Sequence, residues 1–198
     1  MVYFPYLPSW LEGRLAVEFS GLARILEGLG RNTAGMDAGS LAAALVSGAA
    51  MLIGMAGQIV GGRIADRMDL RKAYVLFFGM ALPSLVAARF VGGWMTVPFL
   101  GFYTFFALGM QPIENSLYAM LTPPRWRSSG FGIKFTLGFG VGSLAVAVVS
   151  RLQPVVGLDG VMLLAAGYLA VTVVMAGVLL TAGGRLAIRH IGAAAEEA

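Results

Sequence analysis

The chain has 198 residues, of which 58% are hydrophobic and only 12% are charged, and its formal net charge is +4. A soluble domain carries about 25% charged and about 45–50% apolar residues, so this composition argues against a soluble globular protein. The absence of cysteine excludes thiolate metal sites, disulfides and redox pairs. The basic residues lie between apolar segments rather than in one patch, which favours membrane topology over nucleic-acid binding. We expect no metal and no other cofactor.

The amino-terminal part differs from the rest of the chain. Residues 3–11 are apolar and aromatic, but Pro5 and Pro8 leave them too short to cross a membrane. They lack the basic start and the apolar run of a secretory signal. Over residues 11–29 apolar side chains recur every three or four positions, which predicts an amphipathic helix on the membrane surface or on the protein. Residues 31–39 are rich in glycine and polar side chains, which is typical of a loop.

Five later segments are long and apolar enough to be membrane-spanning helices, each of which needs about 20 residues. Pro83 lies inside the second, where a packed membrane helix tolerates it as a kink. The predicted organisation is an outer segment over residues 1–40, a five-helix bundle over 41–185 and a tail over 186–198. The spans cover about residues 41–62, 73–92, 94–120, 130–150 and 161–182.

Basic residues in short connections orient the predicted spans. The intervening turns carry only Arg89 and Arg151, and three further arginines precede the first span. The alternate connections carry many more, which places the carboxyl terminus in the cytoplasm and the amino-terminal segment outside. We expect an integral protein of the bacterial plasma (inner) membrane. The basic residues of the cytoplasmic connections are Arg63, Arg67, Arg71, Lys72, Arg125, Arg127, Arg185 and Arg189.

The connection after the first span reads GRIADRMDLRK over residues 62–72. It resembles the loop of the major facilitator superfamily, Gly-x-x-x-Asp-Arg followed by basic residues, between the second and third helices of each half. It departs from that pattern at Asp69 and Leu70, where a second glycine and a basic residue are usual. Residues 122–130 are similar to the proline-and-arginine connection between the fourth and fifth helices of a half. The loop residues that match the pattern are Gly62, Asp66, Arg67, Arg71 and Lys72.

The resemblance covers about residues 1–185 and implies the carboxyl-terminal half of such a transporter. The five spans would correspond to helices eight to twelve, and residues 3–11 to the outer end of a truncated seventh. The resemblance also implies that Asp66 caps a neighbouring helix and that Arg67 bridges helices, so that the loop latches the cytoplasmic side shut in one state. A positive-inside connection is the simpler alternative, but it leaves Asp66 and Asp69 unexplained, because acidic residues add little to topology.

Two charged residues lie inside the predicted spans, where ionisable side chains are costly and are treated as functional hypotheses. Glu114 shares a helix face with Gln111, Asn115 and Tyr118 in the third span, and Lys134 lies in the fourth. Both lie about one turn inside the cytoplasmic ends of consecutive antiparallel helices. We predict an ion pair or a shared hydrogen-bond network near the inner mouth of a translocation path.

Two alternatives stay open for these side chains. In one, each side chain extends separately to the aqueous interface, as long side chains near helix ends do. In the other, Glu114 is a proton-coupling carboxylate. In the first span, Gln58 is expected to face the path, beside a small-residue face that predicts close helix packing. That face comprises Ser47, Ala50, Gly54, Gly57 and Gly61.

These patterns predict an all-α membrane bundle, half of a major-facilitator-like fold, that moves a small solute by alternating access, with protons as a candidate coupling ion. A complete transporter has about twice this length, so we expect a missing amino-terminal half or a second chain as partner. An enzyme is not expected, because the sequence offers no metal-ligand cluster and its one histidine, His190, lies in the tail. The alternative function is a non-transporting membrane module for assembly or regulation.

Overall fold

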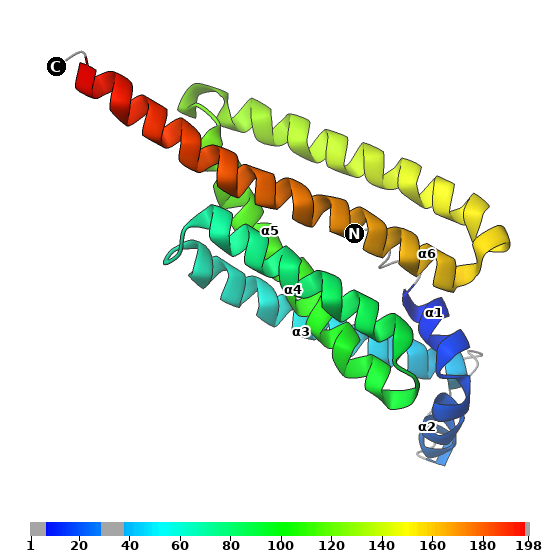
Figure 1. The fold of residues 1–198 in the computed structure, drawn as a ribbon. Coiled ribbons are helices and arrows are strands. Elements are labelled where there is room, and N and C mark those ends of the chain that lie inside the picture. Colours follow the sequence, from blue (N-terminus) through cyan, green and yellow to red (C-terminus); the bar gives the residue numbers. More distant parts are fainter. Residues whose placement is uncertain (1–6, 29–37, 197–198) are drawn as a thin grey trace.

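The structure is a computed structural model that describes residues 7–28 and 38–196, and all regular elements among them are helical (Figure 1). Short 3₁₀ turns η2 (Gly93–Met95) and η3 (Pro124–Trp126) precede the last two helices. The α-helices are α1 (Leu7–Arg14), α2 (Ala16–Gly28), α3 (Ala38–Ala65), α4 (Leu70–Phe90), α5 (Thr96–Leu121) and α6 (Arg127–Glu196).

The long element α6 reverses direction at Gly157, so it consists of two antiparallel arms (Figure 1). Gly157 has φ 69° and ψ 172°, a conformation that a side chain would strain, and Pro154 weakens the helix just before it. We call residues 127–156 the amino-terminal arm and residues 158–196 the carboxyl-terminal arm. The predicted tail does not form a separate segment, because the second arm continues as helix to Glu196.

Four helical stretches among the described residues have the length and apolar composition needed to cross a membrane. The last of them includes both arms of α6, so the five predicted spans coincide with α3, α4, α5 and the two arms. An all-helical fold with several long apolar helices is compatible with an integral membrane protein. The stretches are Gly39–Ala65, Leu70–Phe90, Gly93–Leu121 and Pro124–Thr181.

Helix α3 packs against α5 through the small-residue face predicted from the sequence, whose five members are all buried. Gly57 and Gly61 lie against the backbone of α5, so close that a Cβ at either position would overlap the carbonyl oxygen of Phe105 or Gly109, respectively. One polar contact joins the same helices: Thr104 Oγ1 donates to the carbonyl oxygen of Ala50 at 2.9 Å. Close backbone approach of this kind is how membrane helices gain packing energy without a hydrophobic driving force.

The predicted amphipathic helix over residues 11–29 is divided into α1 and α2 by a bend at Leu15. Leu11, Leu15 and Phe19 are fully buried, so this apolar face lies on the protein. The Phe19 ring also meets that of Trp94 edge-on, with centroids 5.9 Å apart. Residues 31–37 of the predicted loop lie outside the described part of the chain, and residues 38 and 39 already belong to α3.

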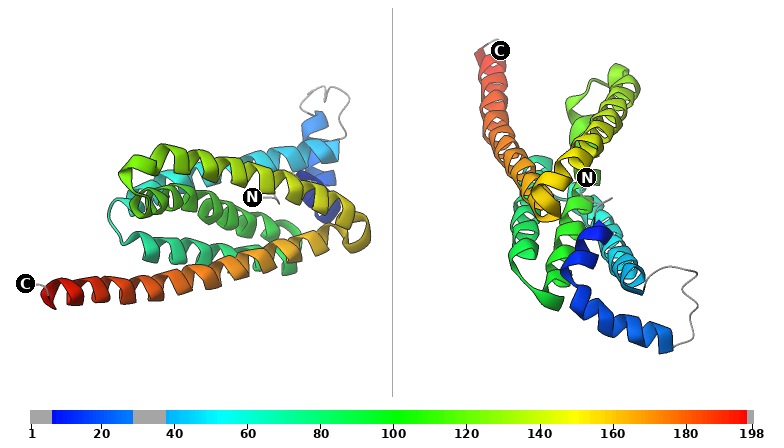
Figure 2. Two further views of the ribbon diagram at one scale, coloured as in Figure 1. Left: turned by 90° about the horizontal axis from the view of Figure 1, so that it is seen from above. Right: turned by 90° about the vertical axis from the view of Figure 1, so that its right-hand side faces the viewer.

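The two arms of α6 differ in how they pack. The carboxyl-terminal arm joins the core through Met162 and Leu169, in the same apolar cluster as Phe78 and Leu85 of α4. The amino-terminal arm stands away from the bundle, and Figure 2 shows the arms diverging from the turn between them. Its exposed apolar side chains suit a lipid or protein environment better than water. They include Ile133, Leu137, Phe139, Val141, Leu144 and Val148.

Candidate functional site

A charged pair connects the amino-terminal arm of α6 to α5. Lys134 Nζ lies 2.9 Å from Glu114 Oε1 and donates to Asn115 Oδ1 at 2.7 Å. The side chain of Lys134 is 19% exposed and that of Glu114 35%, so both are partly buried. The ion pair predicted from the sequence is therefore present. Separate extension of the two side chains to the interface is not the arrangement observed.

Aromatic rings complete the surroundings of the Lys134 ammonium. The ring centroids of Tyr118, Phe131 and Phe135 lie 5.5, 6.0 and 5.9 Å from Nζ, within the range of cation–π attraction. Tyr118 also contacts Phe131, with centroids 5.1 Å apart, so rings from α5 and α6 meet beside the ammonium. We use the name ammonium site for these groups together: Glu114, Asn115, Tyr118, Phe131, Lys134 and Phe135.

Helix geometry explains why these residues converge. Positions 114 and 115 lie four and three residues before 118 and share one face of α5 with it, and 134 and 135 lie three and four residues after 131 on α6. The connection through η3 turns the chain back, so the two faces meet near the same end of both helices (Figure 1). Gln111, predicted on the same face, lies one turn before Glu114 and is half-buried. Gln58, also predicted to face the path, is exposed on α3, and α3 contributes no residue to the ammonium site.

The loop between α3 and α4 is built differently from what the resemblance implies. Asp69 is the N-cap of α4, where its Oδ1 accepts hydrogen bonds from the backbone N–H groups of Arg71 (2.9 Å) and Lys72 (3.2 Å). Asp66 and Arg67 are exposed, and neither side chain bonds to another helix in the described part of the chain. The helix cap here comes from the residue that departs from the family pattern. An aspartate directly before a helical segment is itself a capping signal.

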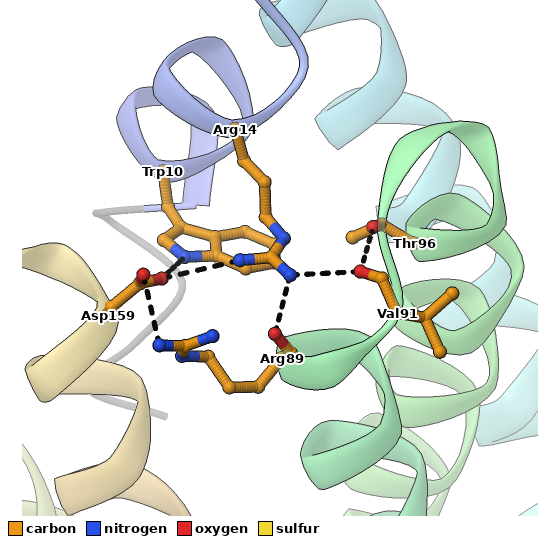
Figure 3. Close-up of polar contacts among 6 residues, drawn as sticks. All are labelled: Trp10, Arg14, Arg89, Val91, Thr96 and Asp159. Atoms are coloured by element: carbon orange, nitrogen blue, oxygen red, sulfur yellow. Dashed lines mark hydrogen bonds and ion pairs between the residues drawn. The ribbon is translucent and has the colours of Figure 1, made fainter.

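A second charged cluster lies at the other end of the bundle, and the sequence alone did not reveal it (Figure 3). Asp159, just after the turn of α6, lies 3.2 Å from Arg89 Nη2 and 3.7 Å from Arg14 Nη1, and accepts a hydrogen bond from Trp10 Nε1 at 3.0 Å. Arg14 also donates to the carbonyl oxygens of Arg89 and Val91. The cluster thus joins α1, the turn after α4 and the turn of α6.

A signal for this second cluster was available in the sequence. Asp159 is the only acidic residue between Glu114 and Glu196, and it lies between two predicted spans, where topology gives no reason for a carboxylate. Its partners come from segments 70 and 145 residues earlier, so only the fold identifies them. Within the described residues, no three His, Asp or Glu side chains come together as a potential metal site.

Comparisons with family models, with curated proteins and with solved structures give no match to this chain. The class of protein therefore follows from the fold and from the two charged clusters. These define an all-helical chain, compatible with membrane insertion, that holds an ion pair between two of its long apolar helices.

Proposed function

We propose that the chain is the carboxyl-terminal half of a secondary transporter of the major facilitator type, which moves a small solute across the membrane by alternating access. The observation that carries this proposal is the partly buried Glu114–Lys134 pair, held between α5 and α6. Bringing charges into an apolar helical layer is costly, and replacing a buried pair by apolar residues is often neutral or stabilising. Stability alone is therefore a weak reason for this pair, whereas transport needs polar groups along its path.

The orientation predicted from basic residues supports the same proposal. The loop between α3 and α4 and the η3 connection lie at the same end of the bundle (Figure 1). Arg67 and Arg125 within them are exposed, as are Lys72 and Arg127 in the first turns of α4 and α6. An end rich in exposed basic side chains belongs in the cytoplasm. The ammonium site then lies toward the cytoplasmic end of α5 and α6. The partner in this proposal is an amino-terminal half or a second chain, which would face the amino-terminal arm.

Transport is tested in the native host, where any partner is present. A strain lacking the chain is compared with the wild type for uptake and efflux of labelled amino acids, sugars, organic acids and amines. The deletion is complemented with wild type, Glu114→Gln, Lys134→Gln and the charge-swapped double variant. We expect the deletion to change the flux of at least one solute, each single variant to fail, and the swap to regain part of it.

Membrane levels of all variants are matched by immunoblot. Unchanged flux across the whole panel in the deletion strain would contradict the transporter proposal and favour a non-transporting assembly or regulatory module. A swap that regains nothing, when each single variant loses transport, would instead remove the pair from the mechanism.

A further inference from the structure

The surroundings of Lys134 have the chemistry of a binding site for an ammonium group. One carboxylate oxygen and one amide oxygen contact Nζ at 2.9 and 2.7 Å, and three aromatic rings lie within 6.0 Å of it. Carboxylates and amide oxygens accept hydrogen bonds from cations, and aromatic faces attract them through the negative charge of the ring quadrupole. Every group that surrounds the ammonium therefore favours a positive charge at that point.

We propose that the ammonium site binds a small organic cation, an amine or quaternary ammonium compound, which takes the place of the Lys134 ammonium beside Glu114. The proposal deepens the proposed function, since it assigns the substrate class of the same site. Lys134 occupies the site when no solute is bound and keeps the Glu114 charge paired. Exchange of one cation for another keeps the Glu114 carboxylate paired. The displaced Lys134 ammonium then extends to the aqueous interface near this end of the helix.

An anionic solute fits the same geometry poorly. It would have to separate Lys134 from Glu114, and it would then meet the carboxylate and three aromatic faces, all of which repel negative charge. Aromatic surface also continues beyond the ammonium. Phe135 stacks on Phe131 and Phe139 stacks on Phe135, each with centroids 6.2 Å apart, and Phe135 and Phe139 are 48% and 75% exposed. A cation with a long apolar body would lie along this stack, whereas a small one such as choline reaches only the rings beside the ammonium.

The site also has a means of exchange. Lys134 is on the amino-terminal arm of α6, which stands away from the rest of the bundle, whereas Glu114 and Asn115 belong to the tightly packed α5. The acceptors are therefore held by the core, while the resident cation is carried by an arm that diverges from it. The long Lys134 side chain has several rotatable bonds, so its ammonium leaves the site without movement of α5.

Binding is measured with the full chain in lipid nanodiscs, using radiolabelled choline as the probe. Its uncharged analogue 3,3-dimethylbutan-1-ol and the anion acetate serve as competitors. Lys134→Met removes the resident cation and is expected to tighten choline binding about tenfold relative to wild type. Glu114→Gln should weaken binding by at least a similar factor. Tyr118→Leu and Phe135→Leu should each weaken it about fivefold, in line with the loss of one cation–π contact.

Phe139→Leu is the matched control, because Phe139 belongs to the same stack but lies beyond the rings that contact the ammonium. It should bind choline like the wild type. If Lys134→Met does not fold, Lys134→Gln takes its place, with the thermal midpoint of each variant as the folding criterion. Equal competition by the uncharged analogue, no gain on removing Lys134, or acetate binding that depends on Lys134 would each overturn the proposal.

The binding assay is independent of transport. Choline binding with these variant effects, together with unchanged fluxes in the deletion strain, would refute the transporter while leaving the cation site. Altered flux of a neutral or anionic solute without choline binding would support the transporter and refute the cation site.

Discussion

A close approach of two helices through glycine gives the sharpest prediction about the stability of this fold. Gly61 of α3 lies against Gly109 of α5, and a Cβ at Gly61 would overlap the Gly109 carbonyl oxygen. The obstacle is backbone, which has no rotamer with which to move aside. Gly61→Ala therefore forces the two helices apart along the interface that carries the small-residue face.

The neighbouring glycine provides a matched control. A Cβ at Gly62 would meet no heavy atom within 4 Å, so Gly62→Ala changes only the helix propensity and should be neutral or stabilising by up to about 1 kcal/mol. Gly61→Ala has the same propensity gain, but overpacking costs about 1–3 kcal/mol and backbone overlap belongs at the upper end of that range. We expect Gly61→Ala to be less stable than Gly62→Ala by about 2–3 kcal/mol.

The measurement is equilibrium unfolding of the purified chain in mixed micelles, followed by circular dichroism as the denaturing detergent fraction rises. Both variants are compared with wild type in the same lipid and detergent mixture. Each must first show wild-type helicity before the titration. Equal stability of Gly61→Ala and Gly62→Ala would show that α3 and α5 do not approach through this glycine, and the reasoning about the small-residue face would be refuted.

Three further substitutions test other contacts. Asp159→Asn should weaken the attachment of α1 to the bundle by about 1 kcal/mol, because Arg14 and Arg89 lose a half-exposed counter-charge. Limited proteolysis of α1 in nanodiscs should then be faster than in the wild type. An unchanged rate would argue against the cluster. Asp69→Ala should destabilise the chain by about 1 kcal/mol, because it removes the cap of α4. Asp66→Ala, at an exposed position without bonds to another described helix, should not. Equal loss of stability in unfolding titrations would show that Asp69 is not the cap that matters. Thr104→Val should lower the free energy of unfolding by about 0.6 kcal/mol in the same titration, since the Thr104 hydroxyl bonds across to α3. Thr172→Val should lower it by less, because the Thr172 hydroxyl bonds within its own helix.

The sequence by itself determined the helical class, the positions of five long apolar segments and the small-residue face of α3. Local composition and helical periodicity indicate these features without knowledge of the fold. The sequence also predicted the ion pair, with separate extension of the two side chains as the alternative, because Glu114 and Lys134 lie at similar depth on consecutive helices. Between neighbouring antiparallel helices, sequence distance is a sufficient guide to spatial distance.

Tertiary structure alone decided what depends on distant segments. It brought Asp159 to two arginines from α1 and the end of α4, and it placed aromatic rings of two helices around one ammonium. It also left Asp66 exposed rather than bonded to a neighbouring helix. The physical reason is the same in each case: side-chain partners are selected by helix rotation, tilt and close approach, and these are set by packing among all the helices together rather than by the pattern within any one of them.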